Sequence, residues 1–274
     1  MNSEDYFIQC MRQYSHSIGD DGAVIANTVY SKDAFFEEVH FKRSWMTPYQ
    51  IATKAMMVNI SDAVAMNARA KYALLSVAMP KNLSKYEMTE LARGFQESAA
   101  KFGIEIIGGD TIANSKLDIT VTIISESKKP LYRQGLKEND LLCYTGKLGE
   151  SKRDLLRVMR GGKLHTKSRF ISLHVRDEFI AKNRSLLRVG MDISDGLFSD
   201  LEKLARINRC GFHFDKKVAK SLGCSGEEYE MLIGIDKRHR KALVHRAKQL
   251  RVPLTIFARV KRKHFKNLCK AHHF

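Results

Sequence analysis

Residues 190–201 read GMDISDGLFSDL, and they place three aspartates, Asp192, Asp195 and Asp200, at the start of a segment with helical apolar spacing. The chain around them is strongly basic, with a formal net charge of +17 from 47 Lys and Arg against 30 Asp and Glu. Carboxylates beside glycine and serine leave room for a ligand to approach the backbone closely. The stretch therefore indicates a site for cations.

Four further acidic motifs lie beside small residues at predicted strand ends or helix starts. They are SIGDDGAV with Asp20 and Asp21, YSKDAFF with Asp33, NISDAVAM with Asp62, and IIGGDT with Asp110. Taken singly, such an aspartate is most often a turn former or a helix N-cap. Oxygen ligands without a His and Cys pattern favour Mg²⁺ over zinc or copper, and Mg²⁺ in enzymes typically joins carboxylates to phosphates. Together the motifs predict a magnesium site that holds nucleotide phosphates.

The apolar spacing predicts a mixed α/β chain with a boundary near Gly146. Thr47-Pro48 predicts the start of a helix over 49–68, and Ser84 with Glu87 predicts a capping box that opens a helix ending near Gly103. Strands are predicted over 71–79, 104–110, 117–127, 140–146, 211–215 and 253–261, and further helices over 151–162, 169–183, 196–209 and 237–250.

Composition excludes several classes of protein. Five cysteines, at positions 10, 143, 210, 224 and 269, are odd in number and form no C-x-x-C pair, so reduced thiols are expected. The first residues, MNSEDYFIQC, have no apolar core of a signal peptide, and the longest apolar runs are far short of a membrane span. P-loop and protein-kinase glycine motifs do not occur. A soluble cytoplasmic protein without a membrane partner is expected.

The basic excess has two explanations, attraction to a polyanion or a generally basic surface. Basic residues thicken in the second half, as in DKRHRKALVHRAKQLR, but no recognisable nucleic-acid module accompanies them. Nucleic acid is therefore not expected as the main substrate.

Seven motifs in sequence resemble the thiamine-monophosphate kinase family, in the superfamily of aminoimidazole ribonucleotide synthetase and selenophosphate synthetase. They are GDDGAV, S-x-D-x-x-x-E-x-VHF, NISDAVAMNA, IIGGDT, R-x-G at 133–135, DISDGL-x-x-DL and SGEEYE. The resemblance implies an α/β (α+β) two-domain fold. Residues 1–140 would form an ATP- and magnesium-binding, dimerising domain with a mixed sheet, and residues 141–274 an α/β domain that completes the active site.

The resemblance also implies the reaction, which is transfer of the γ-phosphoryl group of ATP to thiamine monophosphate. The enzyme would be a homodimer whose N-terminal sheets pair across the interface. No protein nucleophile is implied, because phosphoryl transfer needs charge neutralisation and in-line positioning.

Individual residues receive roles from the same resemblance. ATP would contact Gly109, Asp110, Arg133 and Ser194, and thiamine monophosphate would lie near His40 and Glu227. Several magnesium ions would be held by Asp21, Ser31, Asp33, Asp62, Asp110, Asp192 and Asp195. For His40 a structural role stays open, and for Glu227 that of a solvated acid at a helix start.

Three positions depart from the family pattern. Lys32 stands where a threonine is usual, Glu228 replaces an aspartate, and Ala271 replaces an aromatic residue near the C-terminus. Phosphoryl chemistry is therefore better indicated than thiamine recognition.

Two other hypotheses remain open. Another ATP-using synthetase of the superfamily is opposed by the lack of a Cys or Lys nucleophile motif before GDD. A non-catalytic, basic nucleic-acid-binding protein is opposed by the intact acidic motifs, since carboxylates without metal repel phosphates.

Overall fold

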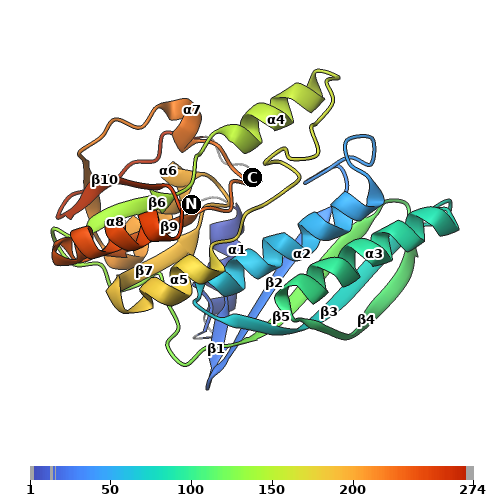
Figure 1. The fold of residues 1–274 in the computed structure, drawn as a ribbon, viewed down its shortest axis with the longest axis horizontal. Helices are drawn as coiled ribbons and strands as arrows, with labels where there is room; N and C mark the ends of the chain where they lie inside the picture. The colour runs from blue at the N-terminus through green and yellow to red at the C-terminus, as the bar shows by residue number, and fades with distance from the viewer. Residues whose placement is uncertain (1–2, 13–14, 16, 270–274) are drawn as a thin grey trace.

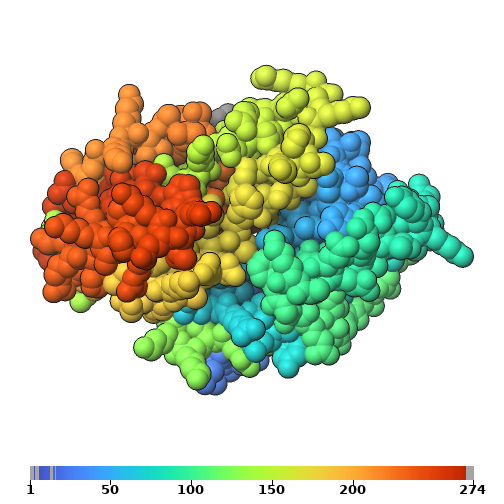
Figure 2. Space-filling view, in the orientation of Figure 1, coloured from blue at the N-terminus to red at the C-terminus, as the bar shows by residue number. Residues whose placement is uncertain are grey.

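The structure, a computed structural model, describes residues 3–12, 15 and 17–269, so Ala271 lies outside the described residues. Within this part, the strands form two five-stranded sheets flanked by helices, and the predicted mixed α/β class is confirmed. Figure 1 shows the N-terminal sheet with its two long helices in one half of the molecule and the C-terminal sheet in the other. Figure 2 shows the segment around α5 (Asp177–Asn183), in yellow, along the seam between the halves.

The first sheet is mixed, as predicted. Its order is β1-β2-β5-β3-β4, and only β3 and β4 are parallel neighbours. The strands are β1 (Ala23–Ile25), β2 (Thr28–Phe36), β3 (Arg69–Pro80), β4 (Glu105–Asn114) and β5 (Asp118–Glu126). On β5, Ile119, Val121 and Ile123 are fully buried, while Thr120 and Thr122 on the other face are half-buried. One face of this sheet therefore packs on the core and the other does not.

Two long helices, α2 (Pro48–Ala65) and α3 (Lys85–Phe102), cover the buried face of this sheet (Figure 1). Both predicted starts are confirmed, because Thr47 with Gln50 and Ser84 with Glu87 form complete capping boxes. Gly103 ends α3 with φ 64°, a left-handed conformation that glycine adopts without a steric penalty.

Helix α2 is the hub of the molecule, since it contacts β2, β3 and β5 of the first sheet and also β7 (Leu187–Asp192) of the second. It is buried over most of its length, and its buried residues include the polar Lys54, Asn59 and Ser61. Buried polar side chains need partners, so these three must be bonded to neighbouring elements.

The second sheet is antiparallel throughout, with the order β7-β9-β6-β10-β8. Its other strands are β6 (Leu141–Thr145), β8 (Gly211–Phe214), β9 (Met231–Ile235) and β10 (Leu254–Lys261). The further helices of the described part are α1 (Ser3–Arg12), α4 (Glu150–Met159), α6 (Leu197–Asn208), α7 (Lys220–Gly223) and α8 (Arg240–Gln249), with short 3₁₀ turns at Arg184–Leu186 and Lys237–His239. The division between 140 and 141 falls in the connection between the two sheets and stays a prediction. No described helix is long and apolar enough to cross a membrane.

The helix predicted over 169–183 forms only over 177–183. Ahead of it the chain forms one turn, in which the backbone nitrogens of Ile171 and Ser172 donate to the Ser168 carbonyl oxygen, and residues 173–176 are irregular.

Strands β1, β2, β7 and β9 were not predicted. Strand β9 is a short apolar run, MLIGI, and apolar periodicity alone does not separate such a strand from buried helix. Strand β7, LRVGMD, carries Arg188 and Asp192 among its apolar residues and so gives only a weak apolar signal.

One expectation about the cysteines is wrong. Cys224 and Cys269 form a disulfide across 45 residues, while Cys10, Cys143 and Cys210 are free. The pairing depends on how the C-terminal segment returns to the second sheet, where Phe265 packs on Phe212 with ring centroids 5.3 Å apart. Spacing along the sequence carries no information about this return.

Close packing between α2 and α3 gives a testable prediction at Gly94. A methyl group there would lie 2.5 Å from the Tyr49 carbonyl oxygen and 2.9 Å from the Ala52 Cβ. In an open helix Gly→Ala would gain about 1 kcal/mol. Here overpacking should outweigh that gain, with a typical cost of about 1–3 kcal/mol. Gly94→Ala should therefore lower the free energy of unfolding in urea titrations.

The matched control is Gln96→Ala, on the exposed face of α3, which should change stability by no more than about 0.5 kcal/mol. A stabilised Gly94→Ala chain would contradict the close approach of the two helices.

Candidate active site

A cavity of about 270 Å³ lies where β2, α2 and the loops after β7 and before β9 meet. It brings together nine of the residues predicted for the site. They are Asp21, Asp33, His40, Asp62, Arg133, Asp192, Ser194, Asp195 and Glu227. Residues more than two hundred positions apart in the sequence thus share one polar cavity.

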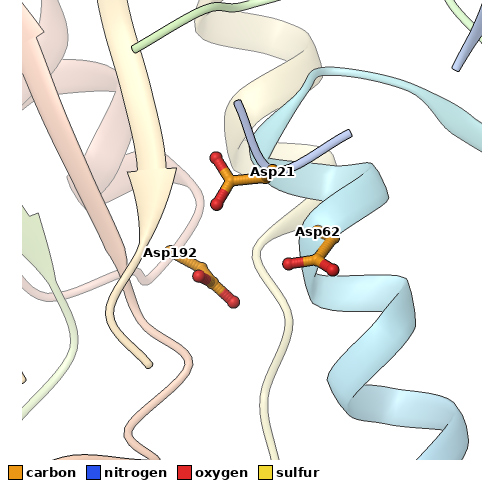
Figure 3. A group of neighbouring side chains, drawn as sticks. All are labelled: Asp21, Asp62 and Asp192. Atoms are coloured by element: carbon orange, nitrogen blue, oxygen red, sulfur yellow. The ribbon is translucent and has the colours of Figure 1, made fainter. Parts of the chain in front are cut away.

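Three carboxylates converge in this cavity. Asp21, Asp62 and Asp192 each offer an oxygen, and these oxygens lie within 4.8 Å of one another. Figure 3 shows the three side chains pointing into one shared space, from the segment before β1, from α2 and from the end of β7. Hard oxygen donors in this number are the ligand type that Mg²⁺ prefers. The site fits a magnesium ion.

The electrostatics of the cavity also favour a cation. Removal from bulk water raises the pKa of the Asp62 and Asp192 carboxyls well above their usual range, and the neighbouring carboxylates add to both shifts. The same removal from water, with the Asp21 charge nearby, raises the pKa of Asp33 to about 6. These carboxyl groups do not readily ionise all at once. A divalent cation between them would stabilise their ionised forms.

The NISD motif positions these carboxylates from within α2. The Asn59 amide oxygen accepts a hydrogen bond of 2.8 Å from the Asp33 backbone nitrogen, and its amide nitrogen donates to the Ala55 carbonyl. Ser61 donates a hydrogen bond of 2.7 Å to Asp192. Asn59 therefore ties β2 to α2, and Ser61 orients Asp192. Neither was singled out from sequence, although both belong to the motif.

Ser31 does not line the cavity. It is buried beside α2, and its hydroxyl lies 3.5 Å from the Asn59 carbonyl oxygen. Ser31 lies two residues before Asp33 on the same face of β2, and its role as a metal ligand stays a prediction.

Arg133 joins the connection between the two sheets to the GDD motif. Its guanidinium lies 2.6 Å from one Asp21 oxygen and 3.3 Å from the other, and its backbone nitrogen donates to Asp20. Burial acts to lower the pKa of Arg133, but the charge and hydrogen bonds of Asp21, with Asp200 and Asp192 nearby, raise it overall, so the guanidinium stays charged. A guanidinium carries five N–H donors in a planar arrangement, and this arrangement also suits phosphate oxygens.

The DISDGL motif forms the wall contributed by the second sheet. Two backbone hydrogen bonds join the loop after β7 to the loop before β9. The Glu227 nitrogen donates to the Ser194 carbonyl oxygen at 2.7 Å, and the Tyr229 nitrogen donates to the Ile193 carbonyl oxygen at 2.9 Å. Lys203 was missed from sequence, and its ammonium lies 2.5 Å from Asp195. Lysines on the polar face of an amphipathic helix are mostly exposed to solvent, so nothing in the sequence singles out this one.

His40 and Glu227 both border the cavity. His40 accepts a hydrogen bond of 3.0 Å from the Phe36 backbone at Nδ1, so the neutral ring carries its proton on Nε2. Glu227 lies 2.8 Å from the ammonium of Lys54, which is fully buried and 3.6 Å above the centre of the Phe170 ring. The helix-start alternative for Glu227 is wrong, because residues 224–230 are not helical.

Asp110 and Gly109 lie elsewhere, on the exposed edge strand β4. Asp110 is in register with Ser76, Thr120 and Ala34, so β5 and β3 separate it from β2. At about 4.8 Å between neighbouring strands, this places Asp110 about 14 Å from β2. A single chain does not bring Asp110 to the cavity, and its role stays a prediction.

Two of the departures from the family pattern have local explanations. The Lys32 ammonium donates to the Thr120 and Thr122 hydroxyls at 3.1 and 3.4 Å. Glu228 accepts a hydrogen bond of 2.8 Å from the Gly149 backbone nitrogen and another from the Ser225 hydroxyl. Glu228 therefore stabilises the start of α4, where a carboxylate is favourable.

The chain is similar to known proteins in sequence and in fold. The family model of AIR synthase related protein, N-terminal domain, matches residues 19–126. Thiamine-monophosphate kinase of Nitrosopumilus maritimus is 30% identical over 224 residues, which cover 75% of this chain and 72% of that protein. The enzyme of the same name from Buchnera aphidicola subsp. Schizaphis graminum is 33% identical over 258 residues, which cover 82% of this chain and 78% of that protein.

A solved structure described as AaThiL complexed with AMPPCP and TMP has the same fold. It matches with a TM-score of 0.86 at 22% identity, covering 97% of this chain and 94% of that one. On the identity and coverage of its curated relatives, the chain belongs to the thiamine-monophosphate kinase family.

Proposed function

We propose that this chain transfers the γ-phosphoryl group of ATP to thiamine monophosphate and so forms thiamine diphosphate. The observation that carries the proposal is the convergence of Asp21, Asp62 and Asp192 in a chain of this family. The related AaThiL structure is complexed with AMPPCP and TMP, which supports ATP and thiamine monophosphate as the pair of substrates. Another synthetase of the superfamily has less support, since the relatives at 30 and 33% identity are thiamine-monophosphate kinases.

Magnesium would be held by Asp21, Asp62 and Asp192, with Asp33 beside them. When bound, it would neutralise charge on the phosphates and on the transferring group. Arg133, now paired with Asp21, would donate to phosphate oxygens once a metal ion shares the Asp21 charge. Ser194 borders the same space and would contact the nucleotide.

The acceptor needs no protein nucleophile, because its own phosphate oxygen attacks the γ-phosphorus while the bond to the β–γ bridging oxygen breaks. His40 would donate from Nε2 to the acceptor phosphate. Glu227 would face the cationic thiamine, and Lys54 behind it fixes the carboxylate. The roles of His40 and Glu227 rest on their place at the cavity edge.

We also propose a homodimer formed through the helix-free face of the first sheet. This face carries Tyr30, Tyr72 and Leu74, which are 39, 42 and 37% exposed. Exposed apolar side chains in one patch are typical of an interaction surface. Asp110 lies on the same face, in the row of Ala34, Thr120 and Ser76. A dimer would give Gly109 and Asp110 a route to the nucleotide that a single chain lacks.

The first prediction of this proposal concerns Asp62→Asn. The change removes one carboxylate charge from the metal site at nearly constant volume. It should lower kcat by a factor on the order of 10² or more, equivalent to about 2.7 kcal/mol. The measurement is the initial rate of thiamine diphosphate formation at saturating ATP and Mg²⁺.

Asp177→Asn is the matched control, because Asp177 is exposed in the first turn of α5. It should leave kcat unchanged. Near-normal turnover of Asp62→Asn at saturating Mg²⁺ would exclude the carboxylate cluster as the catalytic metal site.

A second prediction concerns pH in the absence of metal. Asp33 has a pKa of about 6 in the folded chain against an ordinary value of 3.8, so the folded state binds its proton more tightly than the unfolded state. The stability from this group is therefore fully present below about pH 4 and is lost as the pH rises through about 6. In EDTA, the free energy of unfolding should fall less steeply with pH for Asp33→Asn than for the parent. Equal slopes in urea titrations would contradict the shift.

A third prediction tests the dimer. Light scattering should give about twice the chain mass of 31.3 kDa for the parent at micromolar concentration. Leu74→Asp should give the single-chain mass, because it places a charge in the proposed interface. Leu156→Asp, at an exposed apolar position on α4, should stay dimeric. A monomeric parent would rule out this assembly.

A further inference from the structure

Asp195 differs from the converging carboxylates of the cavity. Within the described residues, the group whose oxygens could share one metal ion contains Asp21, Asp62 and Asp192 but not Asp195. The Asp195 carboxylate instead lies 2.5 Å from the ammonium of Lys203. The positive charge beside Asp195 is therefore supplied by a side chain, the Lys203 ammonium.

Helix α6 holds that ammonium in place. Asp200 lies one turn before Lys203, and its carboxylate is 3.0 Å from the ammonium. Asp200 is fully buried, and its other oxygen has no hydrogen-bond partner among the described residues. Because a buried charge needs a partner, Asp200 fixes the position of Lys203.

Lys203 keeps access to the cavity while it bridges the two carboxylates. Its side chain is 28% exposed, and it lines the cavity together with Arg133 and Lys32. An ammonium has three donors, and Asp195 and Asp200 account for two of them. Because the described residues provide no further hydrogen-bond partner for this ammonium, the third donor can reach an oxygen in the cavity, such as one from a phosphate.

We propose that Lys203 is a resident cation of the nucleotide site, which takes at Asp195 the place of a divalent ion and donates to a nucleotide phosphate. The inference rests on the proposed function, because it assigns a role within the same site. Asp200 is then a positioning residue. Lys32 has no such role, since its ammonium is bonded to the Thr120 and Thr122 hydroxyls rather than to a carboxylate.

The test counts Mn²⁺ ions per chain by equilibrium dialysis in the presence of AMPPCP. Lys203→Met removes the ammonium beside the Asp195 carboxylate, so the variant should bind one more Mn²⁺ than the parent. Lys203→Arg keeps the charge and should bind the parent number. Asp195→Asn in the Lys203→Met background should remove the additional ion, which assigns that ion to Asp195.

Lys203→Met also leaves Asp200 as an unpaired buried charge and could unfold the chain. The double variant Asp200→Asn with Lys203→Met removes that charge, and it should also bind one additional ion. Lys32→Met is the matched control and should bind the parent number. The parent number of ions in both Lys203→Met chains would overturn the inference and leave the proposed function standing. A parent chain that binds no Mn²⁺ with AMPPCP would instead contradict the proposed function.

Discussion

Mutual repulsion among carboxylates is the constraint on which this site depends. Asp21, Asp62 and Asp192 reach one small space from three separate parts of the chain. Ionised carboxylates at this distance, partly withdrawn from water, destabilise one another unless cations lie between them. The surrounding structure is therefore built to supply positive charge, from Arg133 on one side and Lys203 on the other. Magnesium and nucleotide would complete the balance.

Helix α2 converts this constraint into a fold. It contacts both the first sheet and β7, so it packs against elements from both halves of the molecule. Its buried polar residues bond to elements of both halves. Lys54 pairs with Glu227, Asn59 with the β2 backbone, and Ser61 with Asp192. Without these bonds the three buried side chains would have no hydrogen-bond partner. The same contacts therefore stabilise both the cavity and the junction of the two halves.

Sequence predicted the parts that depend on local chemistry. The starts of α2 and α3, the mixed α/β class and the aspartates that line the cavity all follow from residues close together along the chain. What sequence did not predict depends on long-range packing. Lys203 matters because α6 turns it toward Asp195, and Cys224 meets Cys269 because the C-terminal segment returns to the second sheet. Asp110 belongs to a motif but lies on the far strand of its sheet, which only strand order reveals.

The central claim, that Asp21, Asp62 and Asp192 hold the metal that holds ATP, is tested most directly by a crystal structure grown with Mn²⁺, AMPPCP and thiamine monophosphate. Anomalous scattering at the manganese edge locates the ions independently of any assumption about the ligands. The account predicts a peak about 2.1 Å from oxygens of these three carboxylates and in contact with the nucleotide phosphates. Nucleotide bound in the cavity with no anomalous peak among the three aspartates would contradict it.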